Sequence, residues 1–261
     1  MGIGPQISSS TIRRDVRVAL VEVAARFGAP DETADAVVAA TRGVDADLVV
    51  LPECALSGYV DARGRCDLAR FVEPAARFGE DLTQRGSAIG VIARQARALD
   101  STWVAPLIER DDRGRIFNSV VVIDPNGRVM ARHRKRHPWF PERWATPGDE
   151  PFPLLSIAGR PVTLAICFDV HFLEQEAAEV LGVADVLVFP SAWVDDGPDD
   201  LRGPIFDGLA RRFGLVVANA NWGPGEPRVR GQGRSRIVRP TGESEELLGS
   251  RGPVDLLVQE V

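Results

Sequence analysis

Short runs of apolar, mostly β-branched residues recur along the chain, each bounded by proline, glycine or polar residues. Continuous apolar runs of this length are typical of strands buried on both faces. They predict buried strands over Val16–Val23, Asp47–Leu51, Val162–Ile166, Val186–Phe189 and Leu215–Ala220. Between the strands, apolar residues at helical spacing predict helices. The predicted helices cover Asp31–Arg42, Ala75–Leu99 with a break near Gly86 or Gly90, Glu174–Leu181 and Pro204–Phe213.

Turn signals join further runs into hairpins. The turn Asp111–Arg115 connects predicted strands over Trp103–Glu109 and Ile116–Asp124, and the turn at Asn126-Gly127 leads into a strand over Arg128–His133. Residues 134–153 are rich in proline and tryptophan without a period, which predicts an ordered loop. The remaining predicted strands cover Gly233–Arg239, Leu247–Leu248 and part of Pro253–Val261.

The number of strands constrains the architecture. About ten to twelve strands are too many for one flat open sheet in this chain, and hairpins among βα units indicate mixed sheets. The pattern predicts an α/β fold in which two mixed sheets pack face to face with helices outside. Because no linker is visible, we predict a single domain over residues 15–250, an N-terminal extension over 1–14 and a C-terminal tail over 251–261.

Composition narrows the classes of function. Of 261 residues, 44% are hydrophobic and 26% are charged, as in ordinary globular proteins. No apolar run is long enough to span a membrane and no signal peptide is visible, so we expect a cytoplasmic protein that does not bind membranes. The net charge of −6, without a basic patch interleaved with aromatic residues, argues against nucleic acid as a partner.

The three cysteines, Cys54, Cys66 and Cys167, form no CxxC pair. This spacing argues against a disulfide framework and against a zinc site. Each cysteine is therefore either a small buried apolar residue or a reactive thiol.

The positive charges are unevenly divided between the two basic residue types. Of 31 lysine and arginine residues, Lys135 is the only lysine. An ammonium is a compact point charge with a tunable pKa, whereas a guanidinium is planar and always charged. Lys135 is either a residue whose role arginine fills poorly or an exposed lysine that remains by chance.

Three polar residues stand where predicted strands end, namely Glu53, Lys135 and Cys167. Strand ends direct side chains into clefts lined by loops. A thiol becomes a good nucleophile beside a cation or a base, a carboxylate can carry its proton, and an ammonium can stabilise an oxyanion. The three residues predict attack of Cys167 on an amide. The alternatives are a surface ion pair for Glu53 and a place in the core for Cys167.

Three segments that carry these residues resemble the signature blocks of the nitrilase superfamily, the carbon–nitrogen hydrolases. They are LVVLPECALSGY (48–59), RHRKRHPWFPERWATPGDE (132–150) and LAICFDVHFLE (164–174). The resemblance continues to about residue 250. It implies a four-layer α-β-β-α sandwich, with Glu53, Lys135 and Cys167 as the catalytic residues.

The resemblance also implies supporting residues. Glu142 matches a second glutamate that often supports the triad, although a loop ion pair is the alternative, and the Phe168 N–H matches an oxyanion donor. Candidates for the pocket wall are Tyr59, Trp139 and Trp193, each of which could equally pack in the core. No metal and no cofactor is implied, and the family suggests a homodimer or a higher homo-oligomer.

The cysteine block departs from the family pattern. It reads CFDVHFLE, so His171 stands where carboxylate-reading branches carry an arginine, and Cys-Phe-Asp replaces the Cys-Trp-Glu of true nitrilases. His171 either hydrogen-bonds the substrate or has a structural role. We predict a thiol amidase acting on a small neutral or aromatic amide through a thioester. A nitrilase, an acyl transferase and a non-catalytic binding homologue are the alternatives.

Overall fold

The computed structural model describes residues 15–24, 28–58, 71–194, 200–223, 232–248 and 254–261. Within these ranges the chain forms a seven-stranded and a six-stranded sheet. The first sheet has the order β13-β1-β2-β4-β5-β6, with β3 beside β4, and the second has the order β12-β11-β10-β9-β8-β7.

The strands have the following bounds. The first sheet contains β1 (Arg17–Val23), β2 (Leu48–Val50), β3 (Glu73–Pro74), β4 (Thr102–Arg110), β5 (Ile116–Ile123), β6 (Val129–Arg134) and β13 (Val254–Glu260). The second contains β7 (Leu154–Ile157), β8 (Arg160–Leu164), β9 (Val186–Ser191), β10 (Val216–Asn221), β11 (Arg236–Val238) and β12 (Ser244–Glu246).

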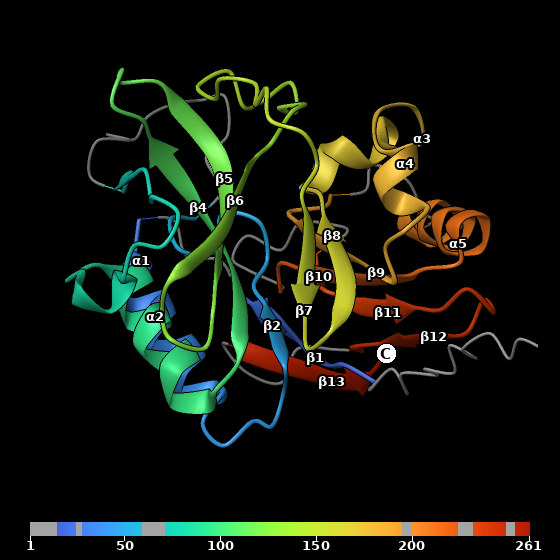
Figure 1. Cartoon of the computed structure of the whole chain (residues 1–261), viewed down its shortest axis with the longest axis horizontal. Coiled ribbons are helices and arrows are strands. Elements are labelled where there is room, and N and C mark those ends of the chain that lie inside the picture. Colours follow the sequence, from blue (N-terminus) through green and yellow to red (C-terminus); the bar gives the residue numbers. More distant parts are fainter. Residues whose placement is uncertain (1–14, 25–27, 59–70, 195–199, 224–231, 249–253) are drawn as a thin grey trace, which may run out of the picture.

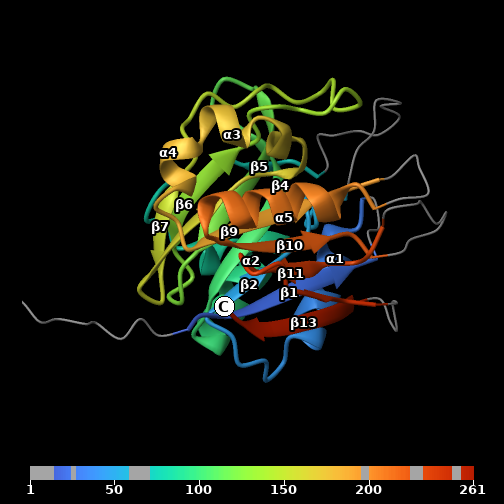
Figure 2. The ribbon, with the colours of Figure 1, turned by 90° about the vertical axis from the view of Figure 1, so that its right-hand side faces the viewer.

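Helices cover the outer face of each sheet, so that the molecule has four layers (Figure 1). The first sheet carries α1 (Pro30–Ala40) and α2 (Ala88–Leu99), and the second carries α3 (Leu173–Glu176), α4 (Ala178–Leu181) and α5 (Arg202–Phe213). Figure 2 shows α5 lying across β9 and β10. In the described part of the chain, no helix has both the length and the apolar character needed to span a bilayer. The predicted α/β sandwich of two mixed sheets is confirmed.

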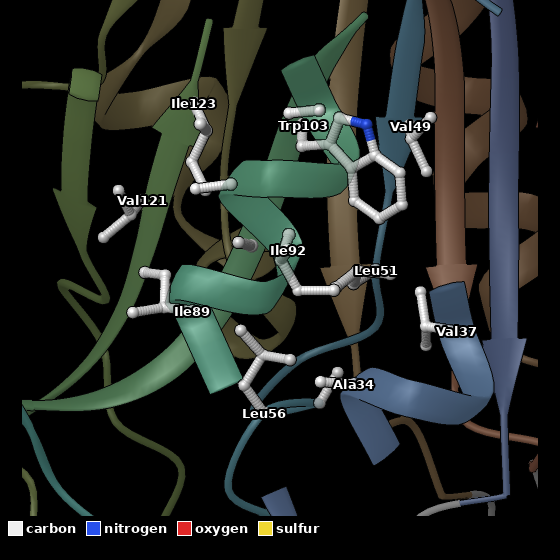
Figure 3. Close-up of a cluster of buried hydrophobic side chains, with 14 of the residues drawn as sticks. Ala34, Val37, Val49, Leu51, Leu56, Ile89, Ile92, Trp103, Val121 and Ile123 are labelled. Carbon is white, nitrogen blue, oxygen red and sulfur yellow. The ribbon is translucent and has the colours of Figure 1, made fainter. Parts of the chain in front are cut away.

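Alternation along the strands explains why separate cores form on the two faces of the first sheet. In β1, Ala19 and Val21 belong to the core under α1 and α2, whereas Val18 and Leu20 belong to the core between the sheets. Successive residues of a strand point to opposite faces, so a strand covered on both faces is apolar throughout. Figure 3 shows the helix-side core, in which Trp103 of β4 lies near Ile92 of α2. A third core fills the space between the second sheet and its helices.

Two predicted helices and one predicted strand differ from the structure, and two short strands, β3 and β7, were not predicted. The strand predicted at Leu247–Leu248 lies a few residues earlier, at Ser244–Glu246. Helix α2 begins only after Gly86, because Gly79 adopts a φ of +77° and the Asp81 side chain caps a short 3-10 turn over Leu82–Gln84. The predicted helix over 174–181 is divided at Ala177, whose φ of −127° interrupts the α conformation. Strand β7 was not predicted, since its four residues alternate in burial at the edge of a sheet.

The last predicted strand is confirmed as β13. It pairs with β1 in antiparallel register, Arg17 opposite Glu260 and Val23 opposite Val254. The predicted C-terminal tail thus includes a strand of the first sheet. The domain limits at residues 15 and 250 stay a prediction.

Strand directions bring distant segments to one edge. Strands β1, β2 and β4 run parallel, as do β8, β9 and β10. Strand β5 is antiparallel to β4 and to β6, so the start of β5 lies level with the end of β6. The segments that follow β2 and β6 and the first residues of β5 therefore meet at the same edge of the first sheet, where Glu53, Lys135 and Asn118 lie.

Candidate active site

Glu53 and Lys135 form a buried ion pair at this edge. Lys135 Nζ lies 2.6 Å from Glu53 Oε1, and neither side chain is exposed to solvent. Burial excludes the alternative of an exposed lysine that remains by chance, and equally that of a surface ion pair for Glu53. A charge of this kind is retained in the interior only when it is paired and hydrogen-bonded.

Glu142 completes a three-charge cluster. Its Oε2 lies 2.8 Å from Lys135 Nζ and accepts a hydrogen bond from the Trp139 N–H at 2.5 Å. Burial raises the pKa of Glu142 to about 7, and the charge of Glu53 adds to this, against the opposing effect of Lys135. Glu142 therefore does not form a separate ion pair within the loop. It forms a buried ion pair with Lys135, which it shares with Glu53.

The protonation of Lys135 follows from its neighbours. Burial by itself lowers the pKa of this ammonium, but the negative charges around it, that of Glu53 foremost, hold the pKa well above its usual value. An opposite charge within a few ångströms favours the ionised form. Lys135 is therefore a permanent cation at neutral pH.

Cys167 begins the 3-10 turn Cys167–His171 that follows β8. Its φ of +45° lies in the left-handed region, which is rare for a residue with a side chain and costs about 1–2 kcal/mol. Strained backbone of this kind clusters at functional sites. The turn directs Cys167 into a cavity of about 170 Å³ and leaves the residue partly exposed.

The resting form of Cys167 is a neutral thiol. Burial raises the pKa of this thiol and the charge of Glu53 raises it further. The Lys135 ammonium and the Ala192 N–H lower it, but the balance stays well above the usual value. Because only a thiolate is a strong nucleophile, attack by this thiol would require a base that removes its proton.

Asp169 connects the cysteine turn to the lysine loop. Its buried carboxylate accepts hydrogen bonds from the Ile166 N–H at 3.1 Å, the Arg136 N–H at 3.1 Å and the His137 N–H at 2.9 Å. The residue before Cys167 and the residue after Lys135 are therefore held by one side chain. This connection ties the position of Cys167 to that of Lys135.

Three contacts to Glu53 come from residues that the sequence did not single out. Asn118 Nδ2 donates to Glu53 Oε1 at 2.7 Å, the Ala192 N–H donates to Oε2 at 2.9 Å, and the Trp222 indole donates to the Glu53 carbonyl at 2.8 Å. For Asn118 a signal existed, since it is a polar residue inside an apolar strand. A backbone N–H such as that of Ala192 has no signature in the sequence.

The predicted pocket residues lie together around Cys167. Trp139, Phe168, His171 and Trp193 line the cavity with Ala192 and Val194. The His171 ring lies 4.9 Å from the Phe168 ring and 6.0 Å from the Trp193 ring, measured between centroids. Tyr59 lies outside the described residues, as does Cys66.

The described residues leave no arrangement for a metal. Within the ranges that the structure describes, no group of three or more His, Cys, Asp or Glu side chains could hold an ion. The chemical resources of the site are a thiol, a buried ammonium, two carboxylates and the backbone N–H groups near the thiol.

The fold and this site define the class of the protein. The carbon–nitrogen hydrolase family model matches residues 28–244, so the chain belongs to this family, the nitrilase superfamily, whose enzymes hydrolyse carbon–nitrogen bonds other than peptide bonds.

Individual relatives are amidases. The chain is 31% identical to an (R)-stereoselective amidase of a Pseudomonas species over 73% of its own length and 63% of the relative's. It is 29% identical to the deaminated glutathione amidase of Escherichia coli O157:H7 over 76% and 72% of the two lengths.

Among solved structures, an amidase from a Nesterenkonia species superimposes with a TM-score of 0.77 at 26% identity, covering 95% of this chain and 91% of the other. A glutamate-to-glutamine variant of that amidase has been solved with the acetamide moiety of fluoroacetamide added covalently to its active-site cysteine.

Proposed function

We propose that this enzyme hydrolyses a small amide through a thioester on Cys167. The observation that carries the proposal is the buried cluster of Glu53, Lys135 and Glu142 next to a neutral thiol in a cavity. Such a cluster supplies a base and an oxyanion stabiliser to a nucleophile that needs both. The amidase relatives and the covalent adduct of the Nesterenkonia enzyme support the same reaction class.

The first half of the reaction forms the thioester. Glu53 takes the proton of Cys167 while the sulfur attacks the carbonyl carbon of the amide, and the oxygen becomes an oxyanion. Among the described contacts, two of the three N–H groups of Lys135 serve carboxylates, which leaves the third for the oxyanion together with the Phe168 N–H. Glu53 returns its proton to the nitrogen, the C–N bond breaks, and ammonia or an amine leaves.

The second half hydrolyses the thioester. A water molecule gives one proton to Glu53 and attacks the thioester carbonyl, and the same donors stabilise the second oxyanion. The C–S bond then breaks, the proton on Glu53 returns to the sulfur, and the carboxylic acid leaves. The enzyme ends in its starting protonation state.

The lining of the cavity supports a neutral, apolar or aromatic acyl group. Aromatic rings dominate its described wall, and His171 is the basic side chain of that wall. Partial burial lowers the pKa of His171, which therefore is neutral at neutral pH and offers no positive charge to a substrate carboxylate. An amide is favoured over a nitrile because the cysteine block reads Cys-Phe-Asp.

A panel of neutral, acidic and aromatic amides, with the matching nitriles, tests the proposal through release of ammonia. Intact-protein mass spectrometry after brief incubation should show Cys167 carrying the acyl group. Acid plus ammonia from nitriles alone would make the enzyme a nitrilase, and ester or amide products with added amines would make it an acyl transferase. Binding without any product would indicate a non-catalytic homologue.

Two further predictions concern the setting of the enzyme. We propose a cytoplasmic homodimer or a higher homo-oligomer. Light scattering on the purified protein measures the oligomer, and fractionation of the producing cells measures the location.

A further inference from the structure

We propose that Asn118 is a positioning residue that holds Glu53 and Glu142 together as two ionised carboxylates around the single cation Lys135. This inference rests on the proposed function, because it assigns how the base of that reaction is kept ready. Asn118 lies in β5, outside the three segments that resemble the family's signature blocks.

The contacts of Asn118 reach every charged member of the cluster. Its Nδ2 lies 2.7 Å from Glu53 Oε1 and 2.7 Å from Glu142 Oε1, so each of the two amide hydrogens serves one carboxylate. The backbone carbonyl of Asn118 accepts the backbone N–H of Lys135 at 2.8 Å, which continues the pairing of β5 with β6. Asn118 is 1% exposed, so these groups do not exchange readily with water.

The four side chains form a closed ring of donors and acceptors. Lys135 bridges Glu53 Oε1 and Glu142 Oε2, and Asn118 bridges Glu53 Oε1 and Glu142 Oε1. The ring determines how the amide is oriented. The reversed orientation would point Oδ1 at two carboxylate oxygens, which repel it, so only the donating face can meet them.

The charge count shows why an amide suits this place. Above the Glu142 pKa of about 7, two carboxylates and one ammonium leave one net negative charge in the cluster, which makes it able to accept a proton from Cys167. A second cation at position 118 would satisfy the same oxygens but would neutralise the cluster and weaken the base. An amide supplies two hydrogen-bond donors with no charge. It thereby offsets the desolvation cost of the buried carboxylates and leaves the negative charge of the cluster in place.

This orientation of the Asn118 amide also has an energetic cost. Asn118 Oδ1 is buried and has no hydrogen-bond partner among the described residues. Buried acceptors of this kind are uncommon in native proteins and call for a reason. The donation of both amide hydrogens to the carboxylates supplies one.

Three substitutions test the inference through the pH dependence of kcat and kcat/KM. Asn118→Ala removes both donors, which makes the carboxylates easier to protonate. The acidic limb of the pH–rate profile should therefore move to higher pH by about one unit, with KM changing less than kcat. Asn118→Ser keeps one donor and should move the limb by less. Asn118→Asp keeps the shape but adds a third carboxylate, and should move it furthest.

A matched control separates positioning from stability. Asn219 is also fully buried, and its Nδ2 donates to the Phe189 carbonyl at 2.8 Å and to Ser191 Oγ at 2.9 Å, outside the cluster. Asn219→Ala should lower the melting temperature and leave the acidic limb where it is. If Asn118→Ala does not fold, Asn118→Ser, which is small and keeps one donor, decides.

The possible results distinguish a failure of this inference from a failure of the proposed function. An acidic limb unchanged in the Asn118 variants, or moved equally by Asn219→Ala, would overturn the inference while the proposed function stands. If the wild-type enzyme forms no acyl group on Cys167 in the mass spectrometer, the proposed function itself fails.

Discussion

Two regions of the site are built on opposite principles. In the cluster of Glu53, Lys135, Glu142 and Asn118, charges are fully buried and joined by hydrogen bonds of 2.6–2.8 Å. In the cavity, aromatic rings meet at centroid distances of 4.9–6.0 Å and the His171 side chain is exposed. The cluster carries the proposed chemistry, and the cavity receives the part of the substrate that does not react.

The comparison teaches where substitutions should be tolerated. In the cluster each group satisfies its neighbours, so losing one leaves a buried charge or donor uncompensated. In the cavity the contacts are apolar and open to solvent, so a new side chain changes fit without exposing a charge. We therefore expect large losses of rate from the cluster and changes of preference from the cavity.

The largest effect should come from the nucleophile. Cys167→Ala removes the sulfur and with it the thioester, so ammonia release should fall by at least about 10⁴-fold. Alanine adds no bulk at the strained turn, and the melting temperature should change little. Turnover retained in a folded Cys167→Ala enzyme would contradict covalent catalysis.

The next effect tests whether the cation must be an ammonium. Lys135→Arg places a planar guanidinium in a space shaped for a point charge between two carboxylates, so kcat should fall by about 10²–10³-fold. The control is Arg160→Lys, which changes an ion pair to Asp185 of 2.9 Å outside the described site and should leave kcat unchanged. Near-normal rates from Lys135→Arg would show that the buried cation need not be an ammonium.

The third effect concerns pH. Since burial and the charge of Glu53 raise the pKa of Glu142 to about 7, lowering the pH through this range protonates Glu142 and removes one partner of Lys135. The rate of the wild type should therefore decline as the pH falls through about 7, whereas Glu142→Gln should be about tenfold slower at high pH and lack this step. An identical profile in both enzymes would show that Glu142 does not titrate there.

The sequence pointed to the proposed reacting groups more readily than to the residues that contact them. Glu53, Lys135 and Cys167 could be singled out because each follows the end of a predicted strand, and Lys135 was conspicuous as the only lysine. Asn118 was overlooked because it lies inside a strand, where its role appears only once β5 is placed between β4 and β6. The contact from Ala192 comes from its backbone, which every residue shares.

The secondary structure shows the same difference between what the sequence pattern indicates and what depends on local geometry. Continuous apolar runs such as Val186–Phe189 identified their strands because burial on both faces requires them, and the observed strand extends to Ser191. The region before α2 was wrongly predicted as helix, since Asp81 and Gly79 end the helical pattern through side-chain and backbone geometry. Gly90 lies inside α2 without breaking it, and a Cβ there would come 1.9 Å from the carbonyl oxygen of Arg85, in the turn just before the helix.

The smallest effect should come from the cavity, and it tests selectivity rather than rate. His171→Arg adds a permanent positive charge at the mouth of a cavity whose described lining carries none. A substrate carboxylate within about 4 Å would gain about 1 kcal/mol, so kcat/KM for an amide that bears a carboxylate should rise about fivefold relative to its neutral analogue. The neutral variant His171→Gln should leave this ratio unchanged, and kcat for the neutral amide should change little in both because the cluster is untouched. A loss of rate for the neutral amide as large as that of Lys135→Arg would show instead that His171 takes part in the chemistry.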